Sequence, residues 1–425
     1  MKKKKAPLVR RMKEFVKTSV VWGPLDHNLF FTIIFLNVYG IIMVYSASYN
    51  NSITKNYSYF MNNQLKNVIF GFVIMIVASY VNYHRIVRLG WGWFWLLAAV
   101  AIIAALKTPL AHSELGATRW IKLGPVSFQA AEPIKAAIII FFAYYVSYWG
   151  LNRWYNQVLA CLLAIALLGF LFFFSNNLST VIVLFCICAV IILSSVKKPD
   201  LYWYFLIGLA LIIIAAIGVT VYLLMHQGAE NFRFVRIRAW LHPEEYAADE
   251  GLQAMQARYA IGAGGFWGKG LGQSLIKFKL SYSYNDFILA IICEELGVFG
   301  VIVMMTLFGY LLYRIYKIAQ NAWDIEGKVL AIGVFTQIAL QLLINVMVVT
   351  SVIPTTGVTL PFFSAGGTSV VFLLAELGMV LNVDKYAKER RFFEEAERHV
   401  AQMEQRGGIG AAGWRRRLDS ARTRR

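Results

Sequence analysis

Long apolar stretches alternate with short polar segments along almost the whole chain. Many of these stretches are long enough to cross about 30 Å of hydrocarbon as a helix. An open sheet would leave backbone groups unpaired in lipid, so the stretches must form helices. The pattern therefore predicts an all-α polytopic membrane protein with about ten transmembrane helices. The predicted spans cover residues 29–48, 65–82, 90–106, 135–149, 157–174, 178–195, 201–225, 285–313, 328–352 and 368–383.

The composition supports the same class. Of the 425 residues, 59% are hydrophobic and only 15% are charged, and the mean hydropathy is +0.58, unlike a soluble domain. The first apolar run has no small-residue cleavage site behind it, so we predict no removable signal peptide. We divide the chain into a basic N-terminal segment (1–28), a transmembrane domain (29–383) and a basic tail (384–425).

The basic residues predict the orientation. An even number of spans places both termini on one side, and both terminal segments are rich in Lys and Arg, so both are predicted to be cytoplasmic. His84, Arg85 and Arg88 in the first short loop agree with this topology. The net charge of +18 fits topology and anionic headgroups, and no nucleic-acid motif accompanies it, so we predict no nucleic-acid partner.

The predicted outward loops are 107–134, 226–285 and 353–367, and the first two carry more cations than the positive-inside rule favours. An anionic ligand at the outer face would explain them, because Lys and Arg pair well with phosphate oxygens. The alternative is that long loops cross the membrane whatever their charge. The outward cations are Lys107, Arg119, Lys122, Arg233, Arg236, Arg238, Arg258, Lys269, Lys277 and Lys279.

Each outward loop has its own chemical character. Loop 107–134 is predicted to skim the membrane and ends in Glu132 and Lys135, an i,i+3 pair that either stabilises the helix start or forms the floor of a site. In loop 226–285, the amphipathic NFRFVRIRAWL precedes the glycine-rich YAIGAGGFWGKGLGQS, which is either a phosphate cradle or a tight turn. Prolines and glycines in 353–367 predict irregular backbone that lines a cavity.

Three acids stand at the start of an apolar span, in the sequence SYSYNDFILAIICEELGVFG. Because carboxylates are costly in lipid, Asp286, Glu294 and Glu295 each need a functional or structural reason. Asp286 suits either a site residue at the outer mouth or a helix N-cap, whereas the two glutamates suit pairing with buried cations or backbone. The four cysteines lie in apolar spans without zinc-ligand spacing, so no metal site is predicted from them.

Five segments in order resemble motifs of the SEDS family (shape, elongation, division and sporulation), the group of FtsW, RodA and SpoVE. The resemblance runs from about residue 29 to residue 383 and leans towards the FtsW/SpoVE side. The five segments are GATRWIKLGPVSFQAAEPIK, SNNLST, AIGAGGFWGKGLGQS, LSYSYNDFILAIICEELG and IPTTGVTLPFFSAGGTS.

This resemblance implies a peptidoglycan glycosyltransferase in the bacterial cytoplasmic membrane. It would polymerise lipid II at the outer face, for cell division, cell shape or sporulation, beside a class B penicillin-binding protein that cross-links the product. The family's catalytic aspartate corresponds to Asp286, which would act as the general base.

The resemblance also assigns further site residues. The candidates for binding the substrate pyrophosphate are Arg119, Lys122, Arg233, Arg236, Arg238, Lys269 and Lys277. The candidates for building the cavity are Glu132, Lys135, Asn177, Glu294, Ser364, Gly366 and Gly367. A divalent cation, Mg²⁺ or Mn²⁺, is a possible companion of the pyrophosphate.

The chain departs from the family pattern at several positions. Its Ala130-Ala131, Asn177 and Ala365 stand where the family has Pro-Ser, aspartate and tyrosine, and Ser281 to Asn285 replace a Pro-Glu-Ala-His-Thr run. Two other classes therefore stay open: a lipid II flippase, and a non-catalytic scaffold that activates the penicillin-binding protein. A flippase should carry its key charges near the midplane and show an inverted repeat, whereas here the cations cluster in outward loops.

Overall fold

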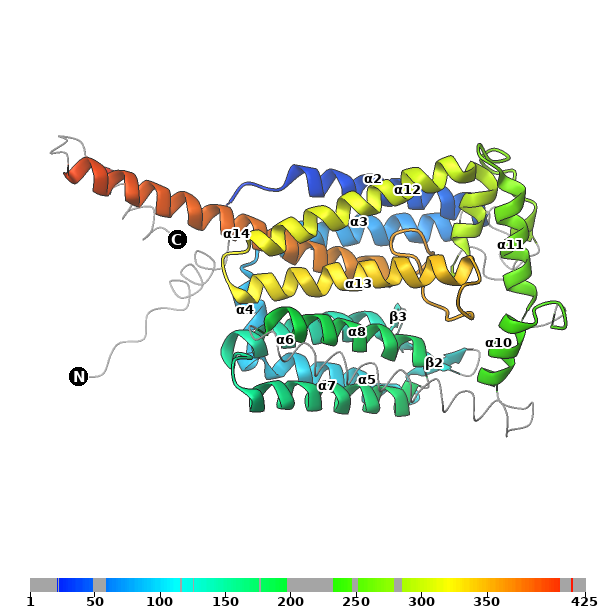
Figure 1. The fold of residues 1–425 in the computed structure, drawn as a ribbon, viewed down its shortest axis with the longest axis horizontal. Helices are drawn as coiled ribbons and strands as arrows, with labels where there is room; N and C mark the ends of the chain where they lie inside the picture. Colours follow the sequence, from blue (N-terminus) through cyan, green and yellow to red (C-terminus); the bar gives the residue numbers. More distant parts are fainter. Residues whose placement is uncertain are drawn as a thin grey trace.

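The protein is a bundle of long helices with a small sheet and two short helices at one end (Figure 1). The computed structural model describes residues 21, 23–48, 59–114, 117–124, 126–175, 177–196, 232–246, 251–278, 285–405 and 414–415. The predicted span 201–225, Lys279 and residues 281–284 lie outside the described residues.

The elements follow in chain order. The α-helices are α2 (His27–Ser48), α3 (Tyr59–Tyr80), α4 (Tyr83–Val87), α5 (Trp93–Ala105), α6 (Ala131–Tyr148), α7 (Trp154–Ser175), α8 (Leu178–Ser195), α10 (Phe232–Leu241), α11 (Leu252–Gly264), α12 (Ile288–Asn321), α13 (Ile325–Val349) and α14 (Thr368–Gln405). Two short 3₁₀ helices are η1 (Leu89–Gly92) and η2 (Ile276–Phe278). The strands are β1 (Ala111–Glu114), β2 (Ala117–Leu123) and β3 (Val126–Gln129).

Six of the described helices are long and apolar enough to cross a membrane: α2, α3, α7, α8, α12 and α13. Within the described residues, a helix also overlaps each of the predicted spans 90–106, 135–149 and 368–383. The chain is therefore a mostly helical, multi-pass membrane protein, and the count of ten spans stays a prediction.

Helix α13 lies at the centre of the bundle. It packs against α6, α8, α12 and α14, while α3 lies along α14 and α2 lies along α12. The helices α10 and α11 cross one end of the bundle, near β2, whereas α4 and the start of α13 lie at the opposite end (Figure 1). The segments predicted to face outward thus gather at one end of the molecule.

The all-α prediction was wrong for the segment before α6. There, β1, β2 and β3 form an antiparallel sheet in that order, with Trp120 opposite Gln129 and Ile121 opposite Phe128. Thr118, Trp120 and Ile121 of β2 are β-branched or aromatic residues, which favour a strand. Gly124, with φ +61°, supplies the tight turn before β3. The hydropathy pattern missed this sheet because its strands are only four to seven residues long.

Candidate functional site

Asp286 lies in a turn of residues 285–287, directly before α12, and is half-buried. The turn is fixed through its backbone: Asn345 Nδ2 donates to the Asp286 carbonyl at 2.9 Å, and Ser364 Oγ donates to the Asn285 carbonyl at 2.8 Å. Helix α13 and the segment before α14 therefore hold the position of Asp286 together.

The structure does not support the N-cap alternative for Asp286. The N-cap residue of α12 is Phe287, which makes no side-chain capping bond, and the first turn of the helix contains no acid. Asp286 therefore precedes the helix at a position that capping does not require.

The irregular segment 353–367 is built around Ser364. The Leu360 amide donates to Ser364 Oγ at 2.8 Å, and the Gly366 amide donates to the Ser364 carbonyl at 2.7 Å. Asn345 Nδ2 also donates to the Val358 carbonyl, at 3.0 Å. Of the three cavity residues predicted here, Ser364 contacts the turn that carries Asp286. Gly366 and Gly367 follow it, and Gly367 has φ +52°.

Glu294 is completely buried and binds the glycine-rich loop that follows α11. It accepts from Lys269 Nζ at 2.7 Å, from the amides of Leu275 and Ile276 at 3.2 and 3.3 Å, and from the Ser274 hydroxyl. This carboxylate therefore has a cation and three further donors, which offset the desolvation cost of burying its charge.

Glu295 is also completely buried and binds the same loop from its other side. It accepts from the Ser46 hydroxyl of α2, from the Ser274 amide at 3.3 Å and from Lys277 Nζ at 3.5 Å. The prediction that both glutamates pair with buried cations or backbone is confirmed by these contacts.

Glycines at the end of α11 and in the loop after it allow their backbone to contact the backbone of α12. A Cβ atom on Gly264 would lie 1.8 Å from the Cys293 carbonyl oxygen, and one on Gly268 would lie 2.2 Å from that of Glu295. Gly297 kinks α12 at φ +64° beside Phe266. The amides of Lys269 and Gly270 donate to the carbonyls of α12, each at 2.9 Å. Because protein acceptors occupy these amides, the geometry favours the tight turn over a phosphate cradle.

The structure divides the predicted pyrophosphate residues into separate groups. Arg119 and Lys122 lie on β2, where Lys122 is exposed, and Arg236 and Arg238 lie half-buried on α10, which also carries Arg233.

Lys269 and Lys277 lie on the glycine-rich loop and both pair with the buried glutamates. The side chain of Lys277 is only 2% exposed and also donates to the Gly272 carbonyl at 2.7 Å. This geometry departs from the predicted pyrophosphate contact of Lys277, because its charge is already paired inside the protein.

Glu132 and Lys135 form the predicted pair, with 2.8 Å between Oε1 and Nζ, and both are buried in α6. Glu376 of α14 interacts electrostatically with both residues and accepts from Gln337 Nε2 at 2.7 Å. Sequence reasoning missed Glu376 and Gln337. The available signal was Glu376 itself, an acid inside an otherwise apolar span.

Three of the unusual positions lie together. Ala130, Ala131 and Asn177 line one small cavity between the start of α6, the end of α7 and the start of α8. Asn177 is the N-cap of α8, where its Oδ1 accepts from the Thr180 amide at 3.3 Å. An aspartate would cap this helix equally well, so Asn177 keeps the structural role while removing a charge.

Known proteins resemble this chain over most of its length. A family model described as cell cycle protein, FtsW/RodA/SpoVE, matches residues 26–389. A probable peptidoglycan glycosyltransferase FtsW of Trichlorobacter lovleyi is 33% identical over 393 residues, which cover 88% of this chain and 96% of the relative. Stage V sporulation protein E of Bacillus subtilis is 33% identical over 372 residues, which cover 84% and 96%.

Solved structures share the fold. A chain from a peptidoglycan synthase complex, described as coordinating polymerization and crosslinking, matches with a TM-score of 0.70 at 22% identity. The rod shape determining protein RodA of Thermus thermophilus matches with a TM-score of 0.61 at 22% identity. Each match covers 86% of this chain and 98% of the other chain.

Proposed function

The chain belongs to the FtsW/RodA/SpoVE family of cell cycle proteins, and from this premise we propose that it is a peptidoglycan glycosyltransferase. Family membership confirms the resemblance carried by the five motifs. We place the protein in the bacterial cytoplasmic membrane, where it polymerises lipid II into glycan strands at the outer face.

The observation that carries this proposal is the fixed position of Asp286. Its turn lies at the end of the bundle that also holds β2 and α10, and bonds from Asn345 and Ser364 to the carbonyls of Asp286 and Asn285 fix the backbone of this turn. A general base must be held within reach of the proton that it removes, and this anchoring provides such a position.

The reaction is a single displacement. Asp286 accepts the proton of the acceptor sugar's 4-hydroxyl, and the hydroxyl oxygen bonds to the anomeric carbon of the donor. The bond from that carbon to the pyrophosphate breaks, and undecaprenyl pyrophosphate leaves with the electron pair. One displacement inverts the anomeric centre.

Cations at the same end of the molecule stabilise the leaving group. Lys122 is exposed on β2, the strand that also carries Arg119, and α10 with its arginines lies at the same end of the bundle. Developing negative charge on a pyrophosphate is stabilised by such donors. The proposed companion ion, Mg²⁺ or Mn²⁺, is tested by omitting it from the assay.

The partner is a class B penicillin-binding protein that cross-links the new strand. A structural relative belongs to a complex described as coordinating polymerization and crosslinking, and this chain shares its fold. The identity of the partner sets whether the synthase serves division, elongation or sporulation.

Polymerisation of labelled lipid II by the purified full chain and its partner tests the function. Asp286→Asn removes the base at constant size, and we expect the rate to fall by about 10² to 10⁴. Glu394→Gln changes an exposed acid on α14, far from the site, and should keep the wild-type rate. An Asp286→Asn protein that still makes strands at the wild-type rate would show that another group acts as base.

A lipid II flippase is the second candidate, because Glu132, Lys135 and Glu376 place charges inside the bundle, as carriers do. The same preparations in vesicles separate the two functions. Movement of lipid II across the bilayer without strand synthesis would favour the carrier. Failure of both activities, with the partner's cross-linking still stimulated, would favour the scaffold.

A further inference from the structure

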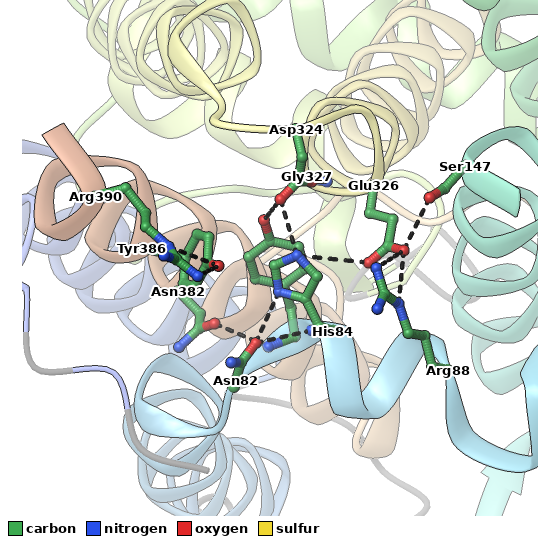
Figure 2. A network of polar contacts seen from close by, with 11 residues as sticks. Asn82, His84, Arg88, Ser147, Asp324, Glu326, Gly327, Asn382, Tyr386 and Arg390 are labelled. Atoms are coloured by element: carbon green, nitrogen blue, oxygen red, sulfur yellow. Dashed lines mark hydrogen bonds and ion pairs between the residues drawn. The ribbon is translucent and has the colours of Figure 1, made fainter. Parts of the chain in front are cut away.

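Three metal-ligating side chains meet at the end of the bundle opposite α10 and α11 (Figure 2). His84 belongs to α4, Asp324 is the N-cap of α13, and Glu326 lies in the first turn of α13. His84 Nε2 lies 2.9 Å from Asp324 Oδ2 and 3.7 Å from Glu326 Oε2. One donor atom from each residue thus lies within 4.8 Å of the other two.

The histidine ring is oriented by its neighbours. Asn82 Oδ1 accepts from the backbone amide of His84 at 3.1 Å, which identifies this atom as an acceptor, and it lies 2.9 Å from His84 Nδ1. Nδ1 therefore carries a proton, and Nε2 faces the two carboxylates. The ring also stacks on Tyr83, with 4.1 Å between centroids. Such an outer hydrogen bond on the far nitrogen is typical of metal-bound histidine.

Only one of the two carboxylate oxygens of Glu326 accepts hydrogen bonds from the described residues. Its Oε1 accepts from Arg88 Nε and Nη2 at 2.9 and 2.8 Å, and from Ser147 Oγ at 2.9 Å. Its Oε2 faces His84 but has no hydrogen-bond partner among the described residues. Only 2% of the residue is exposed, so little solvent reaches this oxygen. A buried carboxylate oxygen without a donor is costly, so this atom indicates a ligand.

Asp324 is held in a similar way. Its Oδ1 accepts from the Gly327 amide at 2.8 Å, and its Oδ2 accepts from the Tyr83 hydroxyl at 2.6 Å. The Gly327 amide and the Tyr83 hydroxyl thus fix the orientation of this carboxyl group, with Oδ2 facing His84.

We infer that His84, Asp324 and Glu326 bind a divalent transition-metal ion, with Zn²⁺ as the best match. One imidazole and two carboxylates suit Zn²⁺, and a tetrahedral ion with bonds of about 2.0 to 2.1 Å separates neighbouring ligand atoms by about 3.3 Å. The observed separations of 2.9 and 3.7 Å lie on either side of this value. No short sequence motif marks this site, because His84 and Asp324 are 240 residues apart.

The ion would join α4 to the start of α13. Around it, Asn382 and Tyr386 of α14 contact the same Tyr83 and His84, so three parts of the chain meet at one point (Figure 2). By the predicted topology this end is cytoplasmic, so the metal site is separate from the proposed glycosyltransferase site and does not depend on it.

Zinc binding by the full-length protein tests the inference. Protein in detergent is treated with EDTA, desalted, incubated with Zn²⁺ and passed through gel filtration, and protein-bound zinc is then measured by mass spectrometry. We expect about one more zinc per chain in wild type than in His84→Ala, and zinc affinity at least about tenfold lower in Glu326→Gln. Zinc should raise the thermal midpoint of wild type, raise that of Glu326→Gln less, and leave that of His84→Ala unchanged.

Matched controls come from the other end of the molecule. His242→Ala and Glu244→Gln change exposed residues of the same types, outside the cluster, and should bind zinc like wild type. Thermal midpoints in EDTA check folding of every variant. Glu326→Gln should fold normally, because the side-chain oxygen can still accept from Arg88 and Ser147.

The competing explanation is a doubly protonated His84 between two carboxylates. In that case, wild type would hold no more zinc than His84→Ala, and zinc would not move its thermal midpoint. Either result overturns the inference.

Discussion

At the scale of single residues, the two lysines of the glycine-rich loop show how burial separates identical side chains. Sequence patterns gave Lys269 and Lys277 the same predicted role, because both stand among outward cations. The structure leaves the Lys269 side chain 32% exposed and the Lys277 side chain 2% exposed. Residue types alone predicted that the buried glutamates have cationic partners. The pairing needed the fold, because Lys269 and Glu294 are 25 residues apart.

Replacing each lysine by methionine separates a structural from a substrate-binding role. Lys277→Met leaves Glu295 buried without its cation, so we expect the free energy of unfolding to fall by about 3 kcal/mol. Lys269→Met should lower it less, because solvent reaches that pair. Thermal midpoints and the KM for lipid II are measured together. A Lys277→Met protein with an unchanged midpoint and a raised KM would restore the predicted pyrophosphate contact.

At the scale of elements, the sequence predicted which segments are helices and loops, but not which of them contact one another. The glycine-rich segment was predicted as a turn or a phosphate cradle, and only the structure places it against α12. Contact between two backbones depends on residues far apart in the chain, which a local pattern does not contain. The sheet before α6 was missed for a related reason, since short strands are specified by their pairing partners.

Two glycines of α11 provide a test of this contact. Gly264→Ala adds a Cβ atom 1.8 Å from the Cys293 carbonyl oxygen, so α11 and α12 must move apart. We expect a lower thermal midpoint and a loss of polymerisation, because the loop held by Glu294 and Glu295 moves with α11.

Gly262→Ala is the matched control, two residues earlier on the same helix. Its Cβ atom meets nothing within 4 Å among the described residues, and alanine favours a helix over glycine by about 1 kcal/mol. This variant should be as stable as wild type or slightly more so. Equal destabilisation by both substitutions would contradict the packing described here.

At the scale of the whole molecule, hydropathy predicted where helices lie along the chain but not which helix sides meet. In lipid, the outer and inner sides of a helix are equally apolar: Phe35 is 59% exposed and the adjacent Leu36 is fully buried. Hydropathy alone therefore did not indicate the central position of α13; the signal lay in its buried polar residues Gln337, Gln341 and Asn345. The distribution of Lys and Arg predicts the orientation of the bundle.

Cysteine labelling measures this orientation. In a background with Cys161, Cys186, Cys188 and Cys293 replaced by alanine, one cysteine is placed at Lys122, exposed on β2, or at Arg398, where the α14 side chain is 78% exposed. In intact spheroplasts, a membrane-impermeant maleimide should label Lys122→Cys and spare Arg398→Cys, whereas permeabilised cells should show both labelled. The reverse pattern would place Asp286 at the cytoplasmic face. It would contradict the proposed polymerisation at the outer face, because β2 and the turn before α12 lie at the same end of the bundle.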